Sequence, residues 1–197
     1  MDTAALLAEI GAEMGDPENP PTTVVPREKV LTWMQSGDIE VLGRTFYFMT
    51  DKRHSPRIRP ALAFEDYHPF AIRYYKRCFR ENPEESKWAL GRYPAGWSFV
   101  NWFAGLWNVS TVPRKALNDL KQLLATLYKE GDSALRTCIV TAILEHLFER
   151  RTIAKFFSNW EQDPILRTAY QEGMQWPKGG GRTPLGKPPP KRFRSKS

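Results

Sequence analysis

Residues 114–149 read RKALNDLKQLLATLYKEGDSALRTCIVTAILEHLFE and carry two apolar patterns of helical period on either side of a Gly-Asp turn. Before the turn the pattern consists of Leu117, Leu120, Leu124 and Leu127. After the turn it consists of Leu135, Ile139, Ala142, Ile143 and His146. Apolar residues at this spacing lie on one face of an α-helix. A Gly-Asp pair suits the end of one helix and the cap of the next, so the stretch predicts two packed antiparallel helices.

Helical patterns extend from this hairpin over residues 64–176. Proline marks the start of three helices, at Pro69, Pro94 and Pro113, and an Asp-Pro pair opens the last one. Short connections make consecutive helices antiparallel. We therefore expect a mainly α fold, built as a bundle or a short array of antiparallel helical hairpins.

The N-terminal part of the chain is less regular. Residues 1–14 have an amphipathic pattern, which predicts a short helix, and residues 15–26 form a proline-rich connector that tethers it loosely. A second short helix is predicted between Pro26 and Gly37. Residues 39–49 combine β-branched and aromatic side chains, and we expect one or two short strands or a small β-hairpin there.

The net positive charge of the chain lies at its C-terminal end. The 197 residues include 29 Lys and Arg and 22 Asp and Glu, a formal net charge of +7 at pH 7. Seven basic residues follow Trp176, so the 22 that precede it balance the 22 acidic residues. Residues 177–197 are also rich in Gly and Pro, which predicts a disordered basic tail after one helical globular domain, residues 27–176. The candidate electrostatic residues of the tail are Lys187, Lys191, Arg192, Arg194 and Lys196.

A second concentration of positive charge lies in residues 52–80, which hold eight basic residues and two acidic ones. Four of these cations follow the i, i+3, i+4, i+7 spacing of one helix face. We call them the basic stripe: Arg73, Lys76, Arg77 and Arg80. The stripe is either a solvated helix face or a site for phosphates or for an acidic protein surface. Further candidates for partner binding are the loop cations Lys52, Arg53, Arg57 and Arg59.

The segment from Pro94 to Trp107 is densely aromatic. Its apolar side chains surround almost the whole circumference of the predicted helix. Such a helix is usually central in a core, and this one is too short to cross a bilayer. We expect it to be buried. The alternative is that part of its aromatic surface is exposed and binds a partner.

No catalytic or cofactor motif is found in the sequence. It has no GxSxG motif, no P-loop and no GxGxxG motif after a strand, and Cys78 and Cys138 have no CxxC partner. The three histidines lack the spacing of a metal site. We therefore expect no catalytic residue, no metal and no cofactor, while a hydrolase built around His68 or His146 stays an alternative. The acidic N-terminus and the absence of a long apolar run predict a soluble, cytoplasmic protein without a membrane span.

Residues 130–149, EGDSALRTCIVTAILEHLFE, resemble the helix-turn-helix segment of small all-helical bacterial immunity-type proteins. In those proteins a Gly-Asp turn is followed by a charged residue and a long apolar helix. The resemblance covers residues 117–170 and implies a non-enzymatic protein that binds and blocks a partner. We therefore expect function through protein–protein interaction. The alternative is a nucleic-acid-associated protein that uses the basic tail and residues 52–80.

Overall fold

The computed structural model describes residues 2–16, 18–83 and 88–175, and this part of the chain is mainly α-helical. The α-helices are, in chain order, α1 (Thr3–Met14), α2 (Arg27–Met34), α3 (Ile39–Thr50), α4 (Phe64–Glu81), α5 (Arg92–Trp107), α6 (Arg114–Glu130), α7 (Ser133–Cys138), α8 (Glu145–Phe148), α9 (Arg151–Phe157) and α10 (Leu166–Gln175). A π-helical turn, η2 (Ile139–Leu144), joins α7 to α8. The 3-10 turns are η1 (Ser55–Arg57) and η3 (Ser158–Gln162).

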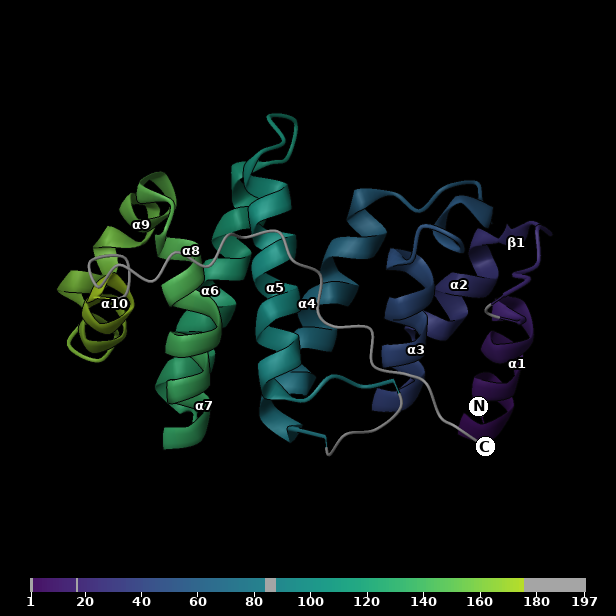
Figure 1. The fold of residues 1–197 in the computed structure, drawn as a ribbon, viewed down its shortest axis with the longest axis horizontal. Helices are drawn as coiled ribbons and strands as arrows, with labels where there is room; N and C mark the ends of the chain where they lie inside the picture. Colours follow the sequence, from purple (N-terminus) through teal and green to yellow (C-terminus); the bar gives the residue numbers. More distant parts are fainter. Residues whose placement is uncertain (1, 17, 84–87, 176–197) are drawn as a thin grey trace.

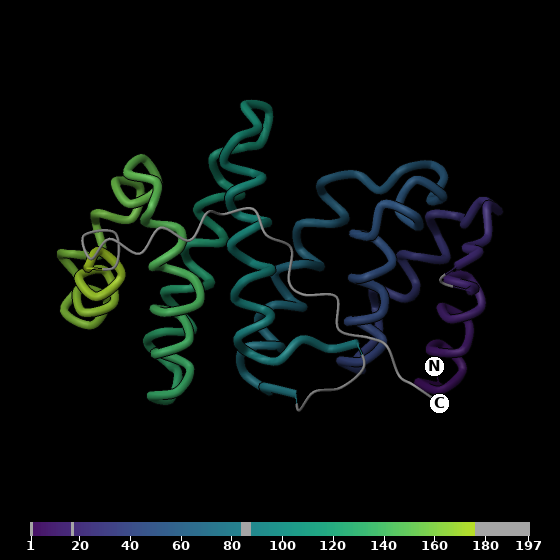
Figure 2. Tube along the Cα trace, in the orientation of Figure 1, coloured from purple at the N-terminus to yellow at the C-terminus, as the bar shows by residue number. Residues whose placement is uncertain are grey.

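The helices lie side by side along one long axis, as the ribbon in Figure 1 and the trace in Figure 2 show. The row begins with α1 at one end and reaches α10 at the other, so the order in space broadly follows the order in the sequence. The predicted mainly α array of helical hairpins is confirmed. Among the described residues, no helix is both long enough and apolar enough to cross a membrane.

The hairpin of α6 and α7 forms as its apolar pattern predicts. Leu120 and Leu124 of α6 are fully buried. The side chain of Asp132 caps α7, because its Oδ1 accepts a hydrogen bond from the amide of Leu135 at 2.6 Å. A cap of this kind contributes about 1 kcal/mol to stability. The Gly-Asp pair therefore separates the two helices as expected.

Residues 39–49 belong to helix α3, so the expected strands or β-hairpin in this segment are wrong. Asp38 caps the helix, since its Oδ1 accepts hydrogen bonds from the amides of Glu40 and Val41 at 2.9 and 3.1 Å. β-Branched and aromatic residues favour strands through packing more than through the backbone itself. Here the packing is helical, against α1, α2 and α4. The buried residues are Val41, Leu42, Gly43, Thr45, Phe46, Phe48 and Met49.

Two short strands connect the proline-rich segment to the loop before α4. They are β1 (Val25–Pro26) and β2 (Ile58–Arg59), and they pair in parallel with Val25 opposite Ile58. Within the described ranges this pair is the whole sheet. The pair therefore joins two loop segments locally and forms no layer of the fold.

A buried arginine fixes the N-terminal helix to the rest of the chain. The side chain of Arg57 is only 6% exposed. It donates hydrogen bonds to the carbonyl oxygen of Glu13 at 2.6 Å and to that of Thr23 at 2.9 Å. Leu6 and Ile10 of α1 are buried, and α1 packs against α3. Helix α1 is thus a packed element, where the sequence predicted a loosely tethered one.

Two glycines of α5 offer a matched test of this packing. A Cβ at Gly96 would lie 2.8 Å from Cβ of Ala142, whereas a Cβ at Gly105 would meet nothing within 4 Å. We expect Gly96→Ala to lower the free energy of unfolding by about 1–3 kcal/mol, because the close contact forces η2 away. We expect Gly105→Ala to raise it by up to about 1 kcal/mol, because alanine is the better helix former. Urea unfolding followed by circular dichroism measures both, and changes of the same sign would contradict the contact.

Candidate binding surfaces

The basic stripe lies along α4, and two of its arginines hold the end of α2 and the turn after it. Arg73 donates a hydrogen bond to the carbonyl oxygen of Met34, the last residue of α2. Arg77 donates to the carbonyl oxygen of Gly37 at 2.5 Å. Carbonyl groups at a helix end lack partners within the helix, so side-chain donors satisfy them. These two guanidinium groups are therefore contacts between elements of the fold.

The rest of the stripe divides into paired and unpaired cations. Arg77 also forms an ion pair with Glu81, one turn further along α4, and Arg80 pairs with Glu130 at the end of α6. Exposed ion pairs of this kind contribute about 0–1 kcal/mol. Lys76 is exposed and forms no ion pair with another described residue. Within the described chain, Lys76 is thus the stripe cation that a partner reaches without breaking an internal contact.

The loop cations are largely used inside the chain. Arg57 is buried and fixes α1, as described above. Arg53 forms an ion pair with Asp51 at 2.9 Å, and hydrogen bonds from Arg53 hold the pKa of Asp51 well below its ordinary value. Arg59 donates to the carbonyl oxygen of the preceding residue, and Lys52 is exposed. The tail candidates lie outside the described residues: Lys187, Lys191, Arg192, Arg194 and Lys196.

Helix α5 is buried on one side and presents aromatic side chains to solvent on another. Phe99 and Phe103 are fully buried. Tyr93 and Trp97 lie one turn apart and are 45% and 51% exposed. We call Tyr93, Trp97 and the exposed Asn101 the α5 aromatic surface. The helix is therefore a core element, as expected, that also exposes part of its aromatic surface, as the alternative stated.

His68 is buried in α4 without a hydrogen bond. Its ring stacks on that of Phe64 at 4.9 Å and lies 5.5 Å from that of Trp102. Its Nε2 is 3.8 Å from Oδ2 of Asp119 on α6, and neither ring nitrogen has a hydrogen-bond partner. Burial lowers the pKa of His68, and the charge of Asp119 offsets part of this effect. His68 is thus a neutral ring at pH 7 in largely aromatic surroundings.

The other two histidines lie near a carboxylate and against an aromatic ring, respectively. His146 approaches Glu149 of its own helical turn at 3.7 Å, and His54 is buried against Phe48 at 5.1 Å between ring centroids. Asp119 beside His68 was not predicted, because only packing brings α4 and α6 together there. The described residues contain no group of three or more His, Cys, Asp or Glu that could hold a metal ion.

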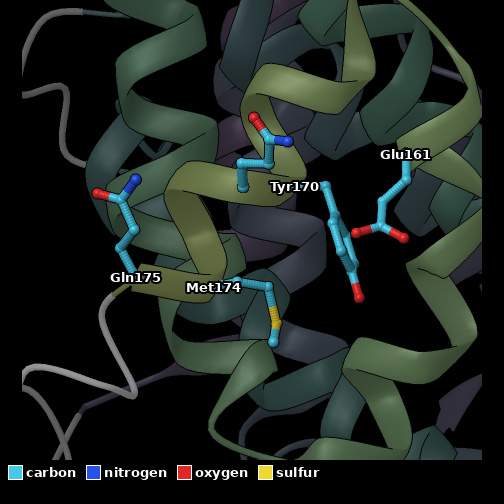
Figure 3. Close-up of a pocket in the computed structure, with 5 residues that line it drawn as sticks. Glu161, Tyr170, Met174 and Gln175 are labelled. Atoms are coloured by element: carbon cyan, nitrogen blue, oxygen red, sulfur yellow. The ribbon is translucent and has the colours of Figure 1, made fainter.

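A pocket of about 350 Å³ lies at the α10 end of the row, and Figure 3 shows its lining. Glu161 of η3 and Tyr170 of α10 turn toward each other across it. Burial, and to a lesser extent the charge of Glu161, raises the pKa of Tyr170, so the phenol stays protonated. Gln171, Met174 and Gln175 complete the lining. The lining therefore offers a phenol, a carboxylate, two amides and a thioether.

Comparison of the chain with protein-family models, curated proteins and solved structures gave no match in any of the three. The resemblance to immunity-type proteins therefore rests on the pattern of residues 117–170 alone. What the chain does has to be inferred from its own surfaces.

The buried state of His68 makes the stability of the fold depend on pH. Burial lowers its pKa below the ordinary value of 6.5, so the unfolded chain takes up a proton more readily than the folded chain. The contribution of neutral His68 to the free energy of unfolding is complete above about pH 6.5 and is lost as the pH falls below that value. We expect His68→Leu to reduce the loss of unfolding free energy between about pH 7 and about pH 5, measured by urea unfolding at each pH. Identical pH profiles for the variant and the original chain would contradict this account.

Proposed function

We propose that this chain is a non-enzymatic binding protein whose partner is another protein, and that the α5 aromatic surface makes the contact. The observation that carries the proposal is the 51% exposure of Trp97 on a helix whose Phe99 and Phe103 are fully buried. Tryptophan and tyrosine supply much of the binding energy of protein interfaces, because they bury a large apolar area and keep one polar group.

The α5 aromatic surface is held in place before any partner arrives. Gly96 packs closely against Ala142 of η2. Arg92, directly before Tyr93, forms an ion pair with Asp132 at 3.1 Å and donates to a carbonyl oxygen near the end of α4 at 2.8 Å. Ordering a flexible side chain on binding costs about 0.5–1.5 kcal/mol. Because this helix is already fixed, binding requires no further ordering of its backbone and avoids that part of the cost.

The shape of the array supports the same proposal. A row of helical hairpins presents a long continuous surface, and proteins with stacked hairpins commonly bind partners along it. A fold does not define a function by itself, however. The exposure of Trp97 is the feature of this chain that gives the surface a specific candidate contact.

The finer form of the proposal is immunity-like inhibition, in which binding blocks the activity of the partner. It is supported by the resemblance of residues 117–170 to immunity-type proteins. This stretch includes η2, which packs directly against α5 at Gly96. If the partner is an enzyme, titration with the chain should reduce its activity, and the same titration with a Trp97→Ser chain should not.

The second candidate function is association with nucleic acid through the tail and residues 52–80. The arginines of residues 52–80 already bond to other residues of the chain, whereas Lys52 and Lys76 are exposed. The tail lies outside the described residues. Nuclease treatment during affinity capture distinguishes this candidate function from protein binding.

Trp97→Ser and Ile165→Ser form a matched pair of variants for the protein-binding proposal. The two side chains are 51% and 46% exposed, so neither replacement opens a cavity in the core. We expect affinity capture from native cells to recover a protein with the original chain and with Ile165→Ser. With Trp97→Ser we expect recovery to fall at least about tenfold, as for loss of a central interface residue. Quantitative mass spectrometry of the captured material measures the difference.

Two further experiments separate protein binding by the α5 aromatic surface from the other candidate functions. Lys76→Glu tests the basic stripe, because reversing Arg73, Arg77 or Arg80 would break internal contacts as well. Nuclease treatment during capture tests whether the recovered protein is bridged by nucleic acid. Equal recovery by the original and Trp97→Ser chains would overturn the proposal. Loss of recovery after nuclease would favour the nucleic-acid alternative.

A further inference from the structure

Two cations of α6 lie over aromatic rings at the junction of α5, α6 and α9. The guanidinium of Arg114 is 4.8 Å from the ring centroid of Trp107 and 4.3 Å from that of Phe156. The Nζ of Lys121, two turns further along α6, is 4.6 Å from the Phe156 centroid. The rings of Trp107 and Phe156 are themselves 5.4 Å apart. We call these four residues the cation–aromatic cluster.

The charges of this cluster have no acidic partner within the described chain. Arg114 and Lys121 take part in none of its ion pairs, and Lys121 instead donates to the carbonyl oxygen of Phe156 at 2.5 Å and to Oδ1 of Asn159. Burial, and then the charge of Arg114, lower the pKa of Lys121. The acid nearest in sequence, Asp119, is paired with Lys115.

A third cation adds to the positive charge at the same junction. Arg150 donates to Oδ1 of Asn108, the residue after Trp107, at 3.1 Å. It too lacks a carboxylate partner among the described residues. In Figure 1 the α5–α6 connection and α9 lie along the same edge of the array. This edge therefore combines unneutralised charge with partly buried aromatic rings, in contrast to the paired arginines of the basic stripe.

We propose that the cation–aromatic cluster binds single-stranded nucleic acid. Phosphate oxygens accept hydrogen bonds from arginine and lysine, and unpaired bases stack on aromatic rings and on arginine planes. Arg114 is an exposed residue whose guanidinium lies over two rings and offers such a plane, and Lys121 supplies a second charge on the same helix face. An acidic peptide would use the charges and leave the stacking surface unused.

This site is separate from the surface of the proposed function. Tyr93 and Trp97 lie in the first two turns of α5, whereas Trp107 is its last residue. The two surfaces are therefore at opposite ends of one helix. A variant that disables one leaves the residues of the other unchanged, so the two proposals fail or succeed independently.

The test is binding of a fluorescent single-stranded oligothymidylate to the full chain, measured by anisotropy over a series of salt concentrations. Arg114→Gln/Lys121→Gln is compared with Arg151→Gln/Lys155→Gln, which also removes one arginine and one lysine, from exposed positions of α9 outside every candidate site, and keeps the tail. We expect the cluster variant to bind about tenfold or more weakly and to reduce the log–log salt slope by about 1.4, for two single-strand phosphate contacts. The control variant should leave both quantities nearly unchanged.

Two more variants separate stacking from charge and from folding. Phe156→Leu should weaken binding about fivefold or more without changing the salt slope, because it removes a stacking ring and no charge. Lys121→Arg keeps the charge and should keep the binding. Absence of binding at low salt would overturn the proposal, as would equal losses in the two double variants. It would also be overturned by duplex DNA that binds as tightly as the single strand, or by polyglutamate that displaces the oligonucleotide equally well.

Discussion

Contact between aromatic rings runs through the core from α3 to α9 and sets the spacing of the helices. The links include Phe46 with Tyr74, Tyr75 with Phe99, and Phe103 with Phe157, at centroid distances of 4.8, 5.4 and 5.9 Å. Each link joins two helices, and α5 supplies the central rings. Aromatic rings are large and rigid, so they fix how closely their helices approach. The α5 aromatic surface therefore lies on a helix that the core already holds in place, and the cation–aromatic cluster includes the last residue of the same helix.

Helical periodicity was the part of the fold that the sequence could predict. Leucines at three- and four-residue spacing in residues 117–127 predicted the buried face of α6, and the Gly-Asp turn predicted the cap that Asp132 provides for α7. The prediction of strands in residues 39–49 failed because β-branched and aromatic side chains pack equally well on a buried helix face. Gly43 in this segment packs against the backbone of Trp88, because a Cβ at this position would lie 2.5 Å from the Trp88 carbonyl oxygen. That requirement comes from a segment far along the chain, which local patterns do not contain.

The positions of basic residues in the sequence did not show which of them are free to bind a partner in the folded chain. The spacing of the basic stripe correctly placed four cations along α4, yet it could not show that Arg77 and Arg80 meet acids or that Arg73 meets a helix end. Arg114 and Lys121 were not predicted as site residues, because they lie seven positions apart in a stretch whose pattern predicts only a packed helix. Only the folded chain shows that Asp119, the acid between them, pairs with Lys115 and that aromatic rings of two other helices lie beneath the cations.

The π-helical turn η2 determines the direction in which the row of helices continues. Before it, α7 packs against α5 and α6, and after it, α8 packs against α9 and α10. A π turn holds one residue more than an α turn, so later side chains are rotated by about 100° relative to an uninterrupted helix. That rotation brings Phe148 against Tyr170, at 5.3 Å between ring centroids. Loss of one residue here would turn the side chains of α8, Phe148 among them, away from these positions, so the length of this turn limits how such a chain can vary and keep α8 packed on α10.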